Sequence, residues 1–177
     1  IGQGINDGDE DEPISVFVPT YMLLNMGVSM AFLAGDLFNM YVGFEVLLVA
    51  SYVLLTLGAS SSRIRAGVSY VMVNMLSSMV FLLAIGLVYQ AVGTVNFAHI
   101  SLRMEDIPDG TRTAIFAVLL VAFAVKAAVF PLSAWLPDSY PTAPSMVTAV
   151  FAGLLTKVGV YAIIRTRSVV FPDGRLD

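Results

Sequence analysis

Three ionisable side chains lie within apolar stretches of the sequence, whereas most other charged residues lie outside these stretches. Glu45, Lys126 and Lys157 each have hydrophobic residues on both sides, whereas all seven arginines lie in polar segments or near the ends of apolar ones. A charged residue at the centre of a membrane helix opposes insertion by roughly 2.5–3.5 kcal/mol, and such residues usually serve transport. The placement of these three groups therefore indicates a function that requires them.

A carboxylate and two lysines in a membrane interior are suited to proton transfer. Burial disfavours the charged form of a side chain, and a nearby opposite charge favours it. If Glu45 approaches Lys126, it stabilises the ammonium group, and its neutralisation or withdrawal promotes proton release. Arginine does not deprotonate in proteins, so lysine is the cation that a relay requires. Two alternatives stay open: lysines that extend to the membrane surface, and a Glu45 that only pairs with a lysine.

Polar residues near these three groups indicate a hydrated path between them. They share helical faces with the ionisable residues or adjoin them in sequence. The candidates for this path are Tyr52, Tyr70, Asn74, Ser77, Ser78 and Thr156. Small and hydroxylated residues also serve ordinary helix packing in membranes, which is the alternative for each of them.

The composition predicts an all-α polytopic membrane protein. The chain has 177 residues, of which 58% are hydrophobic and 12% charged, and soluble domains carry about 25% charged residues. Each crossing needs about 20 apolar helical residues. Five segments qualify: Val16–Ala34, Leu37–Leu57, Ala66–Ala91, Thr113–Phe130 and Thr142–Ile164. We therefore expect an acidic loop over residues 1–15, a five-helix unit over residues 16–165 and a loop over residues 166–177. Because the chain starts with Ile1, we interpret it as an internal fragment of a longer protein.

Prolines predict a broken helix after the fourth apolar segment. Four of them occur between Phe130 and Pro144, beginning with Pro131 and Pro137. Proline lacks an N–H group and its ring clashes with the carbonyl group four residues earlier, which for Pro131 is Ala127. We therefore expect the helix to break near Pro131, beside Lys126. Broken helices next to ionisable groups are typical of transport sites.

The composition argues against several other classes of function. Cysteine is absent, which excludes disulfides and thiol chemistry. The single histidine, His99, lies in a polar stretch and is interpreted as a loop residue. We expect no metal site and no cofactor, and no basic cluster suited to nucleic acid is present.

Three motifs resemble the D subunit of Mrp-type sodium/proton antiporters. They are Gly35 to Glu45, Lys126 to Tyr140, and Leu154 to Tyr161 followed by Arg165. The resemblance implies that the chain is one antiporter-like half-channel repeat from a protein of about fourteen helices. It also implies that Glu45 and Lys126 form a pair that gates protonation of Lys157. Redox-driven relatives often carry histidine where this chain has Ser133 and Tyr140, which favours the antiporter.

The expected function is proton translocation in a multi-subunit cation/proton antiporter. The resemblance implies a multi-pass protein of a prokaryotic plasma membrane that moves H⁺ and Na⁺, assembles with other subunits and is not an enzyme. One alternative is a proton-pumping subunit of respiratory complex I or of a membrane-bound hydrogenase. An alternative of another class is a structural membrane scaffold whose buried charges only pair.

Overall fold

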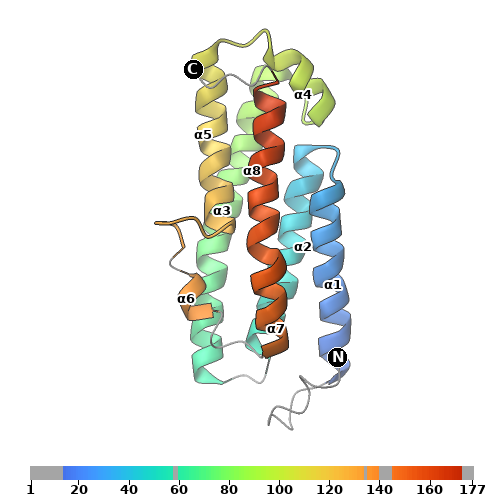
Figure 1. Ribbon diagram of the computed structural model, residues 1–177, viewed down its shortest axis with the longest axis vertical. Coiled ribbons are helices and arrows are strands. Elements are labelled where there is room, and N and C mark those ends of the chain that lie inside the picture. Colours follow the sequence, from blue (N-terminus) through green and yellow to red (C-terminus); the bar gives the residue numbers. More distant parts are fainter. Residues whose placement is uncertain (1–13, 58–59, 134, 140–144, 173–177) are drawn as a thin grey trace.

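The computed structural model describes residues 14–57, 60–133, 135–139 and 145–172. Most of them form helices, and the longest run roughly side by side along the length of the molecule (Figure 1). The helices are α1 (Ile14–Leu33), α2 (Leu37–Thr56), α3 (Ser61–Val92), α4 (Phe97–Met104), α5 (Asp109–Lys126), α6 (Leu136–Ser139), α7 (Ser145–Val150) and α8 (Thr156–Val170). A five-residue π-helix, η1 (Phe151–Leu155), joins α7 to α8. The all-α prediction is confirmed.

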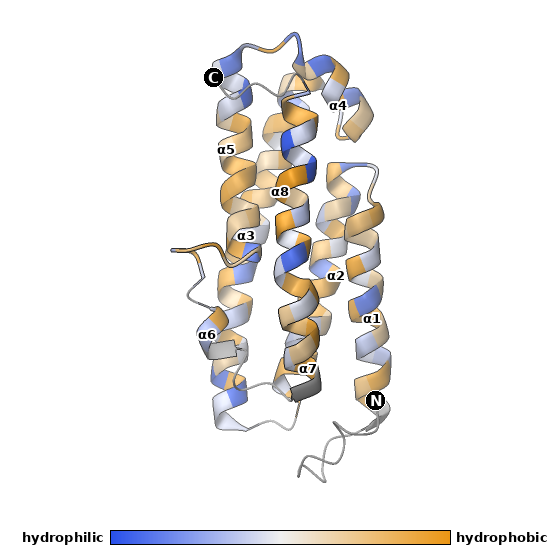
Figure 2. Ribbon diagram, viewed as in Figure 1, coloured by the Kyte–Doolittle hydropathy of each residue, from blue (hydrophilic) through white to orange (hydrophobic). Residues whose placement is uncertain are grey.

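Among the described residues, four helical stretches are long and apolar enough to cross a membrane: Val16–Leu33, Leu37–Thr56, Ser61–Val92 and Val147–Val170. Figure 2 shows hydrophobic residues along most of their length. They correspond to four of the five predicted spans, although α3 begins earlier than expected and α8 continues past the predicted end at Ile164. The remaining predicted span, Thr113–Phe130, corresponds to α5. This helix packs against α3 and α8 but carries three charged residues, Asp109, Arg112 and Lys126.

Helices α1 and α2 form a hairpin whose backbones approach closely. A Cβ atom built on Gly27 would lie 2.7 Å from the Leu47 nitrogen, and one built on Gly43 would lie 2.8 Å from the Ala31 nitrogen. Small residues permit this approach, as is usual between membrane helices. The Asp36 carboxylate accepts a hydrogen bond from the backbone N–H of Asn39 and caps α2. The hairpin thus fixes the helix that carries Glu45.

Residues 92–112, between the third and fourth predicted spans, contain a further helix, α4. Gly93 ends α3 in the left-handed conformation, with φ of 67°, and the Asn96 side chain caps α4. The turn also pairs with the turn between α1 and α2, since Leu37 N–H donates to Val95 and Phe97 N–H donates to Gly35. The predicted spans overlooked α4 because it is short and only one of its faces is apolar.

Helix α5 ends at Lys126, before the expected break at Pro131. The chain leaves helical geometry at Ala127 and Ala128, and Ala128 has a φ of 53°, in the left-handed region. The position has a physical reason, because the ring of Pro131 clashes with the carbonyl group of Ala127 if the helix continues. Pro137, predicted as a second break, lies in the first turn of α6, where proline is tolerated.

Candidate functional site

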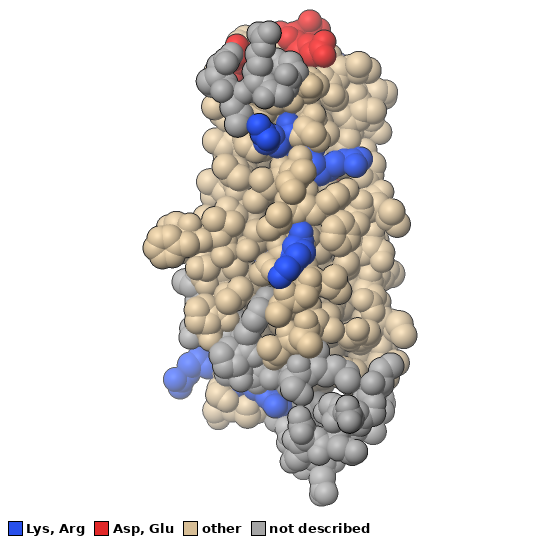
Figure 3. Space-filling model, viewed as in Figure 1, with Lys and Arg blue, Asp and Glu red and all other residues tan. Residues whose placement is uncertain are grey.

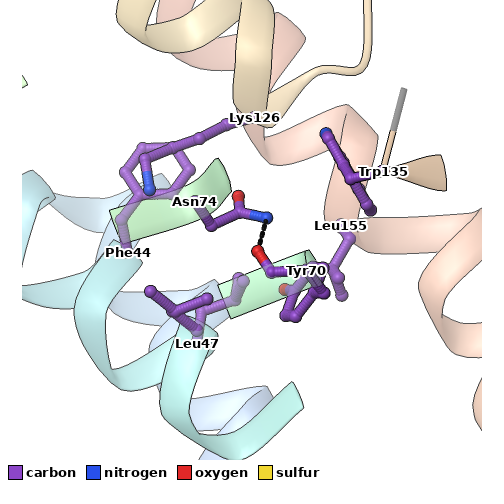
Figure 4. Close-up of a pocket in the computed structure, with 8 residues that line it drawn as sticks. Phe44, Leu47, Tyr70, Asn74, Lys126, Trp135 and Leu155 are labelled. Carbon is purple, nitrogen blue, oxygen red and sulfur yellow. Dashed lines mark hydrogen bonds between the residues drawn. The ribbon is translucent and has the colours of Figure 1, made fainter. Parts of the chain in front are cut away.

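Lys126 occupies the last position of α5 and is buried between α2 and α3. The side chain is 5% exposed. Its Nζ donates a hydrogen bond of 3.1 Å to Oγ of Ser78 on α3. The same ammonium lies over the ring of Phe44 on α2, 5.0 Å from the ring centroid (Figure 4). The one buried lysine of the described chain is therefore held by a hydroxyl group and an aromatic face.

A small cavity lies beside this lysine. Its lining comes from α2, α3, the end of α5, the segment after it and the π-helix, and comprises Phe44, Leu47, Leu48, Tyr70, Asn74, Lys126, Trp135 and Leu155. The cavity volume is about 10 Å³, which is close to the space that one water molecule needs. The surroundings of Lys126 are thus nearly filled, with polar atoms of Tyr70 and Asn74 close by (Figure 4).

A second set of polar contacts fixes the chain just before and after Lys126. The indole N–H of Trp135 donates a hydrogen bond of 2.9 Å to the carbonyl group of Val125. The Trp135 ring meets Tyr70 edge to face with centroids 5.3 Å apart, and the Tyr70 hydroxyl lies 2.6 Å from the Ser51 hydroxyl. These contacts connect the end of α5 to α3 and α2, so they hold the backbone that carries Lys126.

Glu45 does not line this cavity, although it interacts electrostatically with Lys126. It is half-buried, and its Oε1 is buried without a hydrogen-bond partner in the described chain. It lines an open groove of about 370 Å³ between α2 and α3, together with Tyr52 and apolar residues. Leu48 lines both the groove and the Lys126 cavity. The two predicted partners therefore flank one leucine and make no direct ion pair within the part of the chain that the structure describes.

Lys157 lies in the first turn of α8 and is exposed in this chain. Its ammonium donates a hydrogen bond to the carbonyl group of Ala152, inside the π-helix. Figure 3 shows basic side chains set apart from one another on the face that carries α8. The predicted relay residue is thus on the helix that packs beside α5, but the described residues show no hydrogen bond between it and Lys126.

The predicted polar path divides between the Lys126 surroundings and other places. Ser78 binds Lys126 directly, and Ser77 donates to the carbonyl group of Ala122 on α5 at 2.7 Å. Asn74 donates to the Tyr70 carbonyl group of its own helix, and both side chains line the Lys126 cavity. The other two predicted residues lie elsewhere: Tyr52 lines the Glu45 groove, and Thr156 is half-buried beside Lys157.

Sequence reasoning missed Phe44, Ser51 and Trp135 as parts of this site. Each had a signal in the sequence. Phe44 immediately precedes Glu45, Ser51 is the one serine of an apolar segment, and Trp135 is the only tryptophan, placed after the predicted break. Of the two positions compared with redox-driven relatives, Ser133 is half-buried after the break. The other, Tyr140, lies outside the described residues.

Comparisons with known proteins agree on one class. The family model described as "NADH:quinone oxidoreductase/Mrp antiporter, TM" matches residues 34–175. The D subunit of the Na⁺/H⁺ antiporter of Alkalihalophilus pseudofirmus is 43% identical over 156 residues, which are 88% of this chain and 32% of that protein.

Two solved complexes contain similar chains. A chain of the Mrp complex from Dietzia sp. DQ12-45-1b matches with a TM-score of 0.80 and 39% identity, over 87% of this chain and 29% of that one. A chain of an archaeal respiratory complex, the membrane-bound sulfane sulfur reductase, matches with a TM-score of 0.87 and 30% identity, over 94% of this chain and 34% of that one. The chain therefore spans about a third of the length of the relatives that it matches.

The long apolar helices define the fold of a multi-pass helical membrane protein. The chain belongs to the NADH:quinone oxidoreductase/Mrp antiporter transmembrane family. The resemblance to the D subunit of these antiporters, first seen in three motifs, is confirmed over most of the chain.

Proposed function

We propose that the chain translocates protons as part of a cation/proton antiporter, using Glu45, Lys126 and Lys157. The observation that supports this proposal most strongly is the environment of Lys126. This residue is 5% exposed, lies next to a broken helix, and is held by Ser78 and Phe44 rather than by a carboxylate of the described chain. A purely structural lysine in such a place gains most from a direct ion partner. The hydroxyl and aromatic surroundings favour a group that binds and releases protons.

The positions of Glu45 and Lys126 are suited to a switch. Glu45 has a buried oxygen without a hydrogen-bond partner among the described residues and borders an open groove. Lys126 borders the adjoining small cavity, with Leu48 common to both. Protonation of Glu45 removes the negative charge that favours the ammonium form of Lys126. Lys126 then releases its proton toward Lys157. The exposed face of Lys157 is where the rest of the protein continues this path.

The relatives of this chain support an antiporter function for the whole protein. The similar proteins include the D subunit of a Na⁺/H⁺ antiporter and a chain of an Mrp complex. We therefore infer that Na⁺ is the exchanged cation, that the protein works with partner subunits, and that the complex lies in a prokaryotic plasma membrane. It is a transporter rather than an enzyme.

A second candidate function is proton pumping in a redox-driven complex. The match to a chain of an archaeal respiratory complex, with a TM-score of 0.87, favours it specifically. The two functions use the same buried groups and differ in their partners. Purification of the complete complex distinguishes them, because iron–sulfur subunits, seen by their visible absorption, belong to the redox-driven alternative and not to an antiporter.

The experiment that tests the proton role uses the complete complex in everted membrane vesicles. Sodium is added to vesicles with an imposed pH gradient, and dissipation of the gradient is followed with a fluorescent probe. We expect Lys126→Ala and Glu45→Ala to abolish exchange. Lys126→Arg is the matched control, because it keeps the positive charge but cannot deprotonate. Exchange at wild-type rates in Lys126→Arg would exclude proton transfer by Lys126, and wild-type rates in all three variants would leave the scaffold alternative.

A further inference from the structure

We propose that Phe44 is a positioning residue for Lys126: its ring face holds the lysine ammonium away from Glu45 in one state of the switch. The inference rests on the proposed function and adds a residue to it. The ammonium lies over the Phe44 ring, 5.0 Å from the centroid, and bonds Ser78 on the opposite helix. Phe44 is followed directly by Glu45, so one turn of α2 presents both an aromatic face and a carboxylate near the same cation.

The Phe44 ring has a fixed orientation. Its side chain is 2% exposed. It meets Phe81 of α3 nearly edge to face, with centroids 6.1 Å apart, and stacks on Phe123 of α5 at 6.0 Å. Phe81 and Phe123 also contact each other, at 4.7 Å. A ring packed against two neighbours cannot turn away, so its electron-rich face stays directed at the Lys126 ammonium (Figure 4).

Over the Phe44 ring, the Lys126 ammonium group can remain charged without forming an ion pair with Glu45. Glu45 and Lys126 interact electrostatically but border separate cavities on the two sides of Leu48. A cation over a desolvated aromatic ring is stabilised by the ring quadrupole. Without that stabilisation, the ammonium either moves to Glu45, where the closed pair retains its proton, or loses the proton early. Both outcomes slow the transfer that the open arrangement permits.

Fluorinated phenylalanines test the ring quadrupole without changing the shape of the side chain much. Phe44 is replaced in the full complex by 4-fluoro-, 3,5-difluoro- and 3,4,5-trifluorophenylalanine through amber suppression. Sodium-dependent exchange is then measured in everted vesicles and normalised to the amount of assembled complex. We expect the exchange rate to fall stepwise with each fluorine, to about a tenth of the wild-type rate or less for the trifluoro variant, since loss of a desolvated cation–π contact of ~2 kcal/mol corresponds to roughly a thirtyfold change in an equilibrium.

Phe123 is the matched control position. It is fully buried and belongs to the same aromatic cluster, but the cation contact in this cluster is to Phe44. The same series at Phe123 should leave the exchange rate unchanged. Equal rates for the whole Phe44 series, or equal graded losses at both positions, would overturn the inference. Lys126→Ala in the same assay separates the two proposals: if that variant exchanges normally, the proposed function fails, and if it is inactive while the Phe44 series is flat, only the positioning role fails.

Discussion

Gly159 of α8 lies directly against the backbone of Ala127, the residue after Lys126. A Cβ atom built on Gly159 would lie 2.6 Å from the Ala127 nitrogen and 2.8 Å from its Cα atom. Distances under 3.0 Å between such atoms require the backbone to move. The helix that carries Lys157 therefore packs closely against the end of α5, next to Lys126. The two segments that carry the lysines are in backbone contact, although the ammonium groups bind different partners.

We predict that Gly159→Ala destabilises the protein and lowers exchange. The added methyl group must displace the Ala127 backbone, and overpacking of this kind costs about 1–3 kcal/mol. Because Lys126 follows that displacement, the exchange rate falls as well. Thermal unfolding of the purified complex and vesicle exchange provide the two measurements. The control is Gly86→Ala on α3, where nothing lies within 4 Å of the added atom. Equal melting temperatures for both variants would contradict the close contact.

Trp135→Phe should weaken the broken end of α5. The change keeps most of the aromatic packing on Tyr70 but removes the N–H group that donates to Val125 at 2.9 Å. The Val125 carbonyl group keeps the hydrogen bond of 3.1 Å from the Ala128 N–H group, so the change removes one of its two hydrogen bonds, which costs about 0.5–1.5 kcal/mol. We expect a lower melting temperature, and a reduced exchange rate because Lys126 follows Val125 directly. An unchanged rate with a lowered melting temperature would show that the indole contributes to stability alone.

The sequence was sufficient to predict the long helices but not the arrangement of the site. Long apolar runs identify membrane helices because lipid requires every backbone hydrogen bond to be made internally, and four of the five predicted spans are confirmed on that ground. The break was placed at Pro131, whereas the helix ends at Lys126, because proline acts on the turn before it. Sequence reasoning paired Glu45 with Lys126, but the rotation of α2 places Phe44 at the ammonium instead.

The predicted polar path shows the same limit. Four of its residues lie on α3 and were predicted because they share a helical face. In the structure, Ser77 and Ser78 of that face both form hydrogen bonds with α5. Helical spacing shows which residues share a face but not which neighbouring helix packs against it. The contributions of Ser51 on α2 and Trp135 after the break were therefore not predicted. Both depend on contacts between segments far apart in the chain.

Asp36→Ala should destabilise the start of α2 without affecting proton transfer. The Asp36 carboxylate accepts a 2.7 Å hydrogen bond from the N–H group of Asn39, and loss of such a cap costs about 0.5–2 kcal/mol. Asp36→Asn keeps an oxygen acceptor and should melt close to the wild type. Thermal unfolding of the two variants checks this. If Asp36→Asn is destabilised as much as Asp36→Ala, the charge rather than the cap is what the protein requires.

Lys157→Ala should abolish exchange while leaving stability nearly unchanged. In this chain Lys157 is exposed and donates to the Ala152 carbonyl group of its own helical segment, so its removal opens no cavity in the described core. Changes at exposed positions usually stay within about 0.5 kcal/mol. Lys126→Ala differs, because it empties a buried site next to Ser78 and Phe44 and should lower the melting temperature as well.

A comparison of two substitutions at Lys157 distinguishes a role in proton transfer from a need for positive charge alone. Lys157→Arg retains the charge and most of the length of the side chain but cannot release a proton, so we expect it to be as inactive as Lys157→Ala in vesicles. Wild-type exchange in Lys157→Arg would show that this position needs only a positive charge. Inactivity of both variants, at an unchanged melting temperature, indicates that Lys157 passes on the proton that Lys126 releases.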